Sequence, residues 1–232
     1  MTNNYQFAGV CVEITHIHPY FAAMAKDYLG GDKPEFSITV MPEDIRQERE
    51  DTDAADEYLE SLVVYRKLCE KLVERNIILL HSAAIRMDGK AYLFTAPSGT
   101  GKSTHIKLWR KRFGKAVGII NGDKPLISIT PEEIRAWGTP WDGKERWSAN
   151  TSAPIAGICQ IGRGAENAIQ RMKPEDALSV LYAQTYRPTT EAGMRKTLQL
   201  LLEISQRVPF WKLNCNMSEE AAEVSYAAMK GE

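Results

Sequence analysis

The sequence lacks the features that mark several specialised classes of protein. In a chain of 232 residues, 29 basic residues nearly balance 30 acidic ones, so the formal net charge is −1. This balance gives no electrostatic reason to expect a nucleic-acid or membrane partner. The N-terminus MTNNYQFAGV has no basic segment followed by an apolar run, and no apolar run reaches the roughly 18 residues that a membrane helix needs. We therefore expect a cytoplasmic globular protein without a signal peptide.

Cysteine is scarce as well, and its spacing excludes two further classes. The cysteines are widely separated and form no CxxC pair: Cys11, Cys69, Cys159 and Cys215. This pattern argues against a disulfide framework and against a zinc or redox motif. His16 and His18 alternate on an expected strand, but no nearby carboxylate or cysteine spacing supports a metal site there.

Strand-like and helix-like segments alternate along the chain. Residues 1–75 predict an N-terminal α/β extension with strands at 5–15 and 35–41, helices at 19–31 and 58–76, and a solvated polar stretch at 43–57. Residues 76–232 predict the core, with strands at 78–87, 90–96, 116–122, 153–161 and 208–215 and helices at 102–113, 174–186, 189–207 and 218–230. Asp88-Gly89 is typical of a tight hairpin. We expect one α/β domain, with a mainly parallel or mixed sheet covered by helices and the extension packed on the core.

The stretch LFTAPSGTGKST, residues 93–104, joins an apolar strand to a helix through a small polar loop. From Ala96 to Ser103 it matches the phosphate-binding loop (Walker A) pattern, except that alanine stands in place of the first glycine. In such a loop successive backbone N–H groups surround a phosphate, and Gly99 and Gly101 allow the tight bends and the close approach of the anion. The sequence therefore predicts nucleotide binding.

The last residues of the loop have separate expected roles. Lys102 is expected to contact the outer phosphates, Ser103 to offer its hydroxyl to a magnesium ion, and Thr104 to add a phosphate contact, while the helix that begins here points its positive end at the anion. The residues expected to bind the nucleotide are Pro97, Ser98, Gly99, Thr100, Gly101, Lys102, Ser103 and Thr104.

Other signals narrow the class of nucleotide-binding protein. The sequence has no Asn-Lys-x-Asp guanine reader, since INGDKPL holds similar letters in another order, and it has no Leu-Ser-Gly-Gly-Gln signature of transporter ATPases. Asp123 ends the next apolar strand after the loop, where a carboxylate can serve a magnesium ion or accept a proton. The helix that follows the loop has a basic face, which is expected to be solvated: Lys107, Arg110, Lys111, Arg112 and Lys115.

The segment LLHSAAIRMDGKAYLFTAPSGTGKST, followed by VGIINGDKPLI, resembles the HPr kinase/phosphorylase family, which shares a phosphate-loop core with the phosphoenolpyruvate carboxykinases. The resemblance covers roughly residues 77–130. It implies a P-loop kinase-like core with ATP and Mg²⁺ as cofactors, and it places His81 near the active site. It also matches Asp123 to the second of two adjacent aspartates. Because Gly122 replaces the first, Asp123 is left to serve alone, polarised by His81.

We therefore expect an ATP- and magnesium-dependent phosphotransferase that acts on a serine-type hydroxyl of a peptide, protein or small molecule, with Asp123, His81 and Lys102 as its catalytic residues. A nucleotide-binding regulatory protein or an ATPase without kinase activity is the main alternative, and carboxykinase chemistry is a weaker one. A homo-oligomer is left open. The residues expected to bind the acceptor are Trp141, Lys144, Arg146, Arg163 and Asn167. The first three belong to a segment that suits a lid over the phosphates, or equally a packed surface hairpin.

Overall fold

The computed structural model describes residues 1–49 and 52–231, which form two compact units, Met1–Arg75 and Asn76–Glu232. Residues 50 and 51, which belong to the polar stretch expected at 43–57, lie outside the described residues. The rest of that stretch contributes to two helices, α2 (Pro42–Arg49) and α3 (Asp56–Leu72). The expectation that the chain forms one domain stays a prediction.

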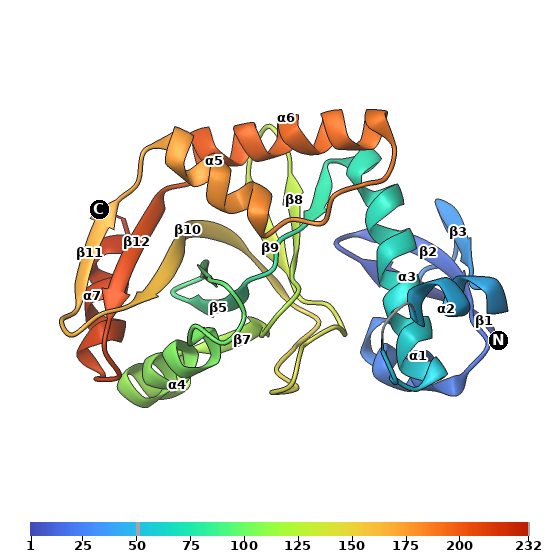
Figure 1. The fold of residues 1–232 in the computed structure, drawn as a ribbon, viewed down its shortest axis with the longest axis horizontal. Helices are drawn as coiled ribbons and strands as arrows, with labels where there is room; N and C mark the ends of the chain where they lie inside the picture. Colours follow the sequence, from blue (N-terminus) through green and yellow to red (C-terminus); the bar gives the residue numbers. More distant parts are fainter. Residues whose placement is uncertain (50–51, 232) are drawn as a thin grey trace. The chain divides into compact units, whose positions relative to one another are not determined.

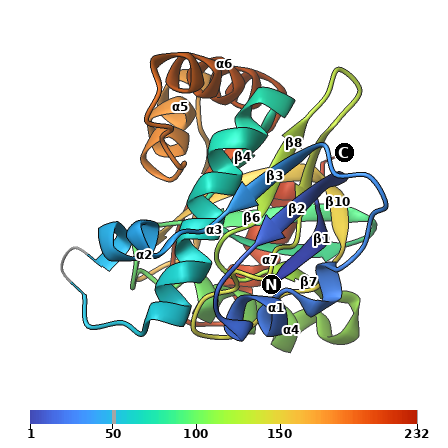
Figure 2. The same cartoon turned by 90° about the vertical axis from the view of Figure 1, so that its right-hand side faces the viewer.

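In the first unit, three strands lie side by side in the order β1-β2-β3 (Figure 2). The strands and the short helices are β1 (Thr2–Phe7), β2 (Val10–Thr15), α1 (Pro19–Met24), η1 (Lys26–Tyr28), β3 (Phe36–Thr39) and η2 (Val73–Arg75). The single strand expected at 5–15 is wrong, because the chain reverses at Ala8 and Gly9 and β1 pairs with β2 in antiparallel fashion. Both turn residues have positive φ, 51° and 84°, as a two-residue hairpin requires.

The second unit is built on a curled, mixed sheet whose main strand order is β4-β8-β9-β10-β6-β5-β7, with β12 beside β10 and β11 beside β12. The strands are β4 (Ile77–Leu79), β5 (Ala83–Met87), β6 (Lys90–Thr95), β7 (Gly118–Asn121), β8 (Leu126–Ile129), β9 (Ile134–Trp137), β10 (Ser152–Arg163), β11 (Ala168–Arg171) and β12 (Phe210–Cys215).

The sheet is not mainly parallel. In the described part of this unit, β10 pairs in parallel with β6 and with β12, and the other strand pairs are antiparallel. The excess of antiparallel pairs arises from short hairpins, among them β8–β9 and β5–β6. The second of these turns at Asp88-Gly89, as the sequence predicts, with φ of 53° and 75°.

One apolar run of the sequence is divided in the structure. The strand expected at 78–87 separates into β4 and β5, and the residues Leu80, His81 and Ser82 lie between them. Leu80 forms an isolated bridge to Thr185 instead of continuing the strand. The interruption leaves His81 at a bend between two strands and half-buried, where its ring and its backbone can contact other segments.

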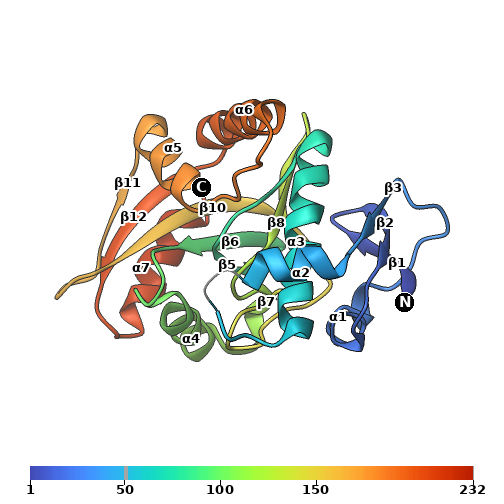
Figure 3. The ribbon, with the colours of Figure 1, turned by 45° about the vertical axis from the view of Figure 1, so that its right-hand side comes forward.

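Helices cover both faces of this sheet (Figures 1 and 3): α5 and α6 lie on one face, α4 and α7 on the other. The helices are α4 (Lys102–Phe113), α5 (Pro174–Ala183), α6 (Glu191–Arg207) and α7 (Glu220–Met229), with the turn η3 (Gly114–Ala116) after α4. Helix α4 contributes the fully buried Trp109, whose ring packs against Tyr92 and Phe94 of the sheet. No described helix is both long and apolar enough to cross a membrane.

A histidine lies in the same core. His105 of α4 is 2% exposed, and its Nε2 accepts a hydrogen bond of 3.1 Å from Trp109 Nε1 and lies 3.2 Å from Ser225 Oγ. Burial lowers the pKa of His105 to about 3, because a charged imidazolium loses its hydration in this core. The side chain is therefore packed and neutral at physiological pH.

We predict that His105 makes the protein less stable in mild acid. The pKa is near 6.5 in the unfolded chain and about 3 in the folded protein, so as the pH falls the unfolded chain binds the proton first. The free energy of unfolding should therefore decrease below about pH 6.5, by about 2 kcal/mol between pH 8 and pH 5 from this residue alone.

Urea unfolding of the wild type and of His105→Gln at both pH values measures this contribution as the difference between their pH dependences. An identical pH dependence in wild type and His105→Gln would contradict the burial of a neutral imidazole.

Candidate active site

The predicted phosphate-binding loop lies between the end of β6 at Thr95 and the start of α4 at Lys102. Gly99 and Gly101 have φ of 78° and 129°, which other residues rarely adopt. A methyl group built on either one meets no atom within 4 Å, so the backbone conformation, rather than crowding, requires glycine there. The first backbone N–H groups of α4, which has 12 residues, have no partner within the helix and can bind an anion.

Arg163 holds this loop from the neighbouring strand. Because β10 runs parallel to β6 with Gln160 opposite Thr95, the end of β10 lies beside the loop. The Arg163 guanidinium donates hydrogen bonds to the carbonyl oxygens of Gly99, at 2.8 Å, and Thr100, at 3.3 Å. The sequence predicts Arg163 as a substrate ligand, and that role stays a prediction, while its observed contacts are to the loop.

Lys102 folds back over the loop that it follows. Its Nζ donates a 3.1 Å hydrogen bond to the Ala96 carbonyl oxygen at the other end of the loop. Burial lowers the pKa of Lys102, and the negative charge of Asp123 opposes this effect. The two residues come from different elements, since Lys102 begins α4 and Asp123 follows β7.

Asp123 follows β7 and is joined to His81 at the bend between β4 and β5. His81 Nε2 lies 3.1 Å from Asp123 Oδ1, and His81 Nδ1 lies 3.0 Å from Gln184 Oε1 at the end of α5. The His81 backbone is fixed as well: its N–H donates to the Gln184 carbonyl at 2.7 Å, and its carbonyl accepts from the Thr95 hydroxyl at 3.0 Å. Both ring nitrogens and the backbone thus hold the imidazole in one orientation.

The sequence does not identify Gln184, because the residue is 103 positions from His81 and belongs to no motif. Only the pairing of the two segments in space, marked by the bridge between Leu80 and Thr185, brings its amide to the imidazole. Its contact with the Nδ1 atom orients the ring toward Asp123, in the way that an outer partner orients a catalytic histidine.

The Asp123 carboxylate is kept ionised by its surroundings. Burial alone would raise the pKa of Asp123, but the hydrogen bond from His81 and the positive charges of His81, Lys124 and Lys102 together lower it below the ordinary value. The side chain remains 27% exposed, and in the described part of the chain Oδ2 accepts no hydrogen bond. A carboxylate oxygen is thus available to a ligand.

These residues suit a magnesium ion. Magnesium prefers oxygen ligands and is usually held by one or two carboxylates together with substrate phosphates and water. The ionised carboxylate of Asp123 and the hydroxyl of Ser103, at the start of α4, are donors of this kind, and they are the residues that would hold the ion.

The segment between β9 and β10 covers Asp123. A Cβ atom built at Gly143 would lie 2.9 Å from Asp123 Cβ, which shows how close the two backbones come. Asp142, in the same segment, has a raised pKa; burial is the main cause, and the charge of Asp123 adds to it while Arg146 opposes it. Sequence reasoning does not single out Asp142, because it belongs to no recognisable motif.

The same segment explains the glycine at 122. A Cβ atom there would lie 3.2 Å from the Asp142 carbonyl oxygen and 3.3 Å from both Cβ and the carbonyl oxygen of Trp147. These contacts are tight, so a side chain at 122 would require the segment to move. The absence of a side chain at Gly122 therefore allows the segment that covers Asp123, residues 139–149, to pack closely against this position.

The other expected acceptor residues occupy two places. Trp141 is buried, while Lys144 and Arg146 are exposed on the segment that covers Asp123. Asn167 lies apart from them: its amide donates to Ser218 Oγ at 3.0 Å and to Glu220 at 2.7 Å, at the start of α7. The acceptor roles of all these residues stay predictions.

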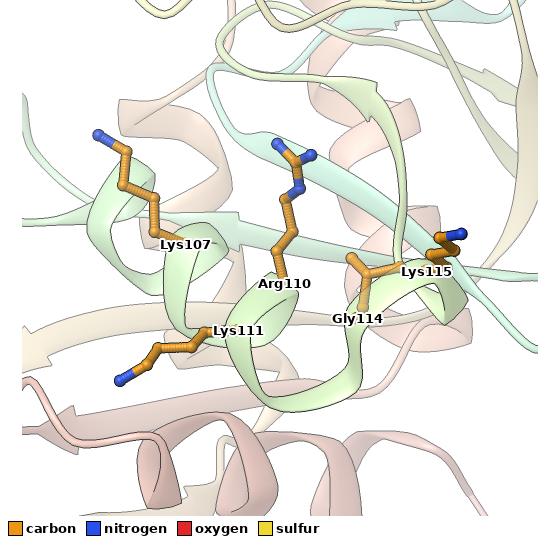
Figure 4. Close-up of a pocket in the computed structure, with 6 residues that line it drawn as sticks. Lys107, Arg110, Lys111, Gly114 and Lys115 are labelled. Atoms are coloured by element: carbon orange, nitrogen blue, oxygen red, sulfur yellow. The ribbon is translucent and has the colours of Figure 1, made fainter.

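A shallow hollow of about 440 Å³ runs along the outer face of α4 and the turn after it (Figure 4). It is lined by Lys107, Arg110, Lys111, Gly114, Lys115 and Val117. Two of these cations have acidic partners, Lys107 with Glu145 at 3.2 Å and Lys111 with Glu219 at 2.8 Å. The hollow follows the later turns of α4, whereas the predicted phosphate-binding loop precedes its first turn. The two are therefore separate places on the protein.

Comparisons with known proteins give no independent evidence for the function of this site. No family model and no curated protein matches the sequence. Among solved structures, the chain is similar to the Hpr(Ser) kinase/phosphatase from Coxiella burnetii, with 9% sequence identity and a TM-score of 0.36, over 66% of this chain and 99% of that one. A likeness of this size shows no family membership, and any function has to be supported by the site itself.

Proposed function

We propose that the protein is an ATP- and magnesium-dependent phosphotransferase that transfers the γ-phosphoryl group to a hydroxyl. The observation that carries the proposal is geometric. His81 contacts Asp123 through its ring at 3.1 Å and Thr95 through its backbone carbonyl at 3.0 Å, and Thr95 immediately precedes the glycine-bearing loop over which Lys102 folds. A phosphate bound by the loop would thus lie near a cation and near an ionised carboxylate, the two groups that phosphoryl transfer needs.

In this reaction the acceptor oxygen forms a bond to the γ-phosphorus, and the bond from that phosphorus to the bridging oxygen of ADP breaks. The proton of the acceptor hydroxyl passes to the Asp123 carboxylate, while His81 keeps that carboxylate in place. Lys102 neutralises charge on the phosphate oxygens during the transfer. Ser103 and Asp123 would hold a magnesium ion, which would supply further neutralisation of the phosphate charge.

The acceptor is best sought among serine-type hydroxyls of peptides, proteins and small molecules. A hydroxyl of this kind is a poor nucleophile until a carboxylate accepts its proton, which is the part we assign to Asp123. The exposed Lys144 and Arg146 lie on the segment that covers Asp123, where they can bind an anionic or polar acceptor. Nothing in this arrangement calls for a nucleic acid or a membrane.

A nucleotide-binding regulatory protein, or an ATPase that transfers phosphate only to water, is the alternative. The observation that favours it is Gly122, where the close approach of Asp142 and Trp147 leaves little room for a further side chain beside Asp123. The two functions differ in whether a hydroxyl acceptor receives the phosphoryl group, and the third prediction below separates them.

The first prediction of the proposed function concerns nucleotide binding. Replacing Lys102 by alanine removes a charge-assisted contact worth about 1.5–3 kcal/mol, so the affinity for ATP should fall by about tenfold to a hundredfold. Calorimetry with a non-hydrolysable ATP analogue and Mg²⁺ measures the change. Lys111→Ala, which removes a cation 72% exposed on the same helix, is the matched control and should bind as the wild type does. Unchanged affinity in Lys102→Ala would refute the assignment of the loop.

The second prediction concerns the chemical step. Asp123→Asn keeps the size of the side chain but removes its negative charge, so the rate of phosphoryl transfer should fall by about 100-fold or more, well beyond any change in nucleotide affinity. His81→Gln should lower the rate less. His81 only orients the carboxylate, and its replacement leaves the charge of Asp123 in place. If Asp123→Asn retains full turnover, the catalytic carboxylate lies elsewhere in the chain.

The third prediction concerns the acceptor. With ATP labelled at the γ-phosphate, the wild type should transfer label to a member of a set of serine-containing peptides and small alcohols, and Asp123→Asn, as the background control, should not. Label that appears only as free phosphate with every candidate would favour the ATPase, and the absence of any ATP binding would exclude both functions.

A further inference from the structure

Asn121, the last residue of β7, is fully buried two positions before Asp123. A buried primary amide has two donor hydrogens and one acceptor oxygen to satisfy, and leaving them without partners is costly. In this protein the Asn121 amide has partners on both sides, and they belong to two different segments.

The carbonyl oxygen of the Asn121 amide fixes the backbone of the turn that carries Asp123. Asn121 Oδ1 accepts hydrogen bonds from the backbone N–H groups of Asp123, at 2.8 Å, and Lys124, at 2.6 Å. An asparagine that bonds the backbone two residues later holds a turn in one conformation. The position of the Asp123 carboxylate is therefore set in part by the side chain of Asn121.

The nitrogen of the amide binds the segment that covers Asp123. Asn121 Nδ2 donates to the carbonyl oxygen of Thr139 at 2.9 Å and lies 3.1 Å from the Thr139 hydroxyl oxygen, with the Trp141 carbonyl at 3.4 Å. The Thr139 hydroxyl in turn donates to the Lys124 carbonyl at 2.8 Å. Because one side of the amide faces N–H groups and the other faces carbonyl groups, its orientation is unambiguous.

The far end of the covering segment is attached to β7 and the turn after it by backbone hydrogen bonds. Gly122 N–H donates to the Trp147 carbonyl at 2.7 Å, and Ala149 N–H donates to the Ile120 carbonyl at 3.1 Å. Residues 139–149 are thus attached to β7 and the turn after it at both ends, and Gly143 is held against Asp123 between the two attachments. The attachment at the near end depends on the side chains of Asn121 and Thr139.

We propose that Asn121 is a positioning residue for the reaction: through Thr139 it joins the covering segment to the turn that carries Asp123, and so fixes the carboxylate toward His81 and the phosphate-binding loop. Its effect on the rate rests on the proposed function, whereas its effect on the geometry of Asp123 does not. Neither Asn121 nor Thr139 is expected to touch a substrate, because both are fully buried.

Thr139→Val tests the proposal, because valine keeps the shape and removes the hydroxyl that joins Asn121 to Lys124. Turnover of ATP, measured as phosphate release without an acceptor, should fall by about tenfold or more, the loss that a small displacement of a catalytic group causes. The affinity for a non-hydrolysable ATP analogue should stay within about twofold, because the phosphate-binding loop keeps its own contacts. Thr139→Ser should restore the wild-type rate.

A second readout does not depend on turnover. The ring of His81 reports the position of Asp123, because the two are 3.1 Å apart. The chain has 4 histidines, and the NMR signals of His81 are identified by their loss in His81→Gln. Those signals should shift in Thr139→Val and return in Thr139→Ser. Thr130→Val, a change of the same kind at an exposed turn, should leave them unmoved.

Asn121→Ser gives an independent test if Thr139→Val does not fold. A serine hydroxyl can still bond the turn, but it is too short to hold Thr139, so the His81 signals should shift in the same direction as in Thr139→Val. Folded variants with unmoved His81 signals would overturn the proposal, even if the wild type turns over ATP. A wild type without turnover would refute the proposed function alone, and shifted signals would still support the positioning role.

Discussion

The contact between His81 and Asp123 is the interaction on which the rest of the candidate site depends. It joins the bend between β4 and β5 to the turn after β7, and through the His81 backbone it also reaches the end of β6 and the end of α5. Because Thr95 ends β6 just before the predicted phosphate-binding loop, one histidine connects the segment that leads into this loop, through its backbone carbonyl, with the carboxylate, through its ring. The division of an apolar run into two strands is the local distortion that permits this arrangement.

Electrostatics at the site follow from partial burial. Removing charges from water disfavours both the ammonium of Lys102 and the carboxylate of Asp123. The charge of each residue offsets part of this effect on the pKa of the other. For Asp123 the neighbouring cations and the imidazole more than offset burial, so the carboxylate stays ionised. For Lys102 burial prevails, so the site holds a lysine whose charge is more weakly favoured than usual and which gains from an incoming phosphate.

Local sequence signals predicted the parts of the structure that depend on short stretches of chain. Glycines at positions of positive φ, the Asp88-Gly89 turn and the apolar spacing of α4 locate the loop between β6 and α4 and its flanking elements from the sequence alone. The sheet was expected to be mainly parallel or mixed, and it is mixed; its excess of antiparallel pairs was not predicted, because the hairpin β8–β9 has no strong turn signal. At Ala8 and Gly9, a turn was hidden inside one apolar run.

The candidate site was predictable only where a motif carries it. Lys102 and Ser103 belong to the loop pattern, Asp123 is predicted from its place at the end of the next strand, and His81 comes from the resemblance. By contrast, Gln184 and Asn121 are ordinary polar residues whose partners are fixed by tertiary contacts, and no period or spacing marks them. Their importance follows from burial and hydrogen bonding, which the sequence does not display.

The tight packing around Gly122 has a consequence for how this sequence can change over time. A Cβ atom at this position would lie 3.2 Å from the Asp142 carbonyl oxygen and 3.3 Å from Cβ and the carbonyl oxygen of Trp147, so the covering segment would have to give by a few tenths of an ångström. A side chain at 122 is therefore accommodated most easily where that segment changes as well. Among descendants of this chain, we expect substitutions at 122 to be accompanied by changes in residues 142–147.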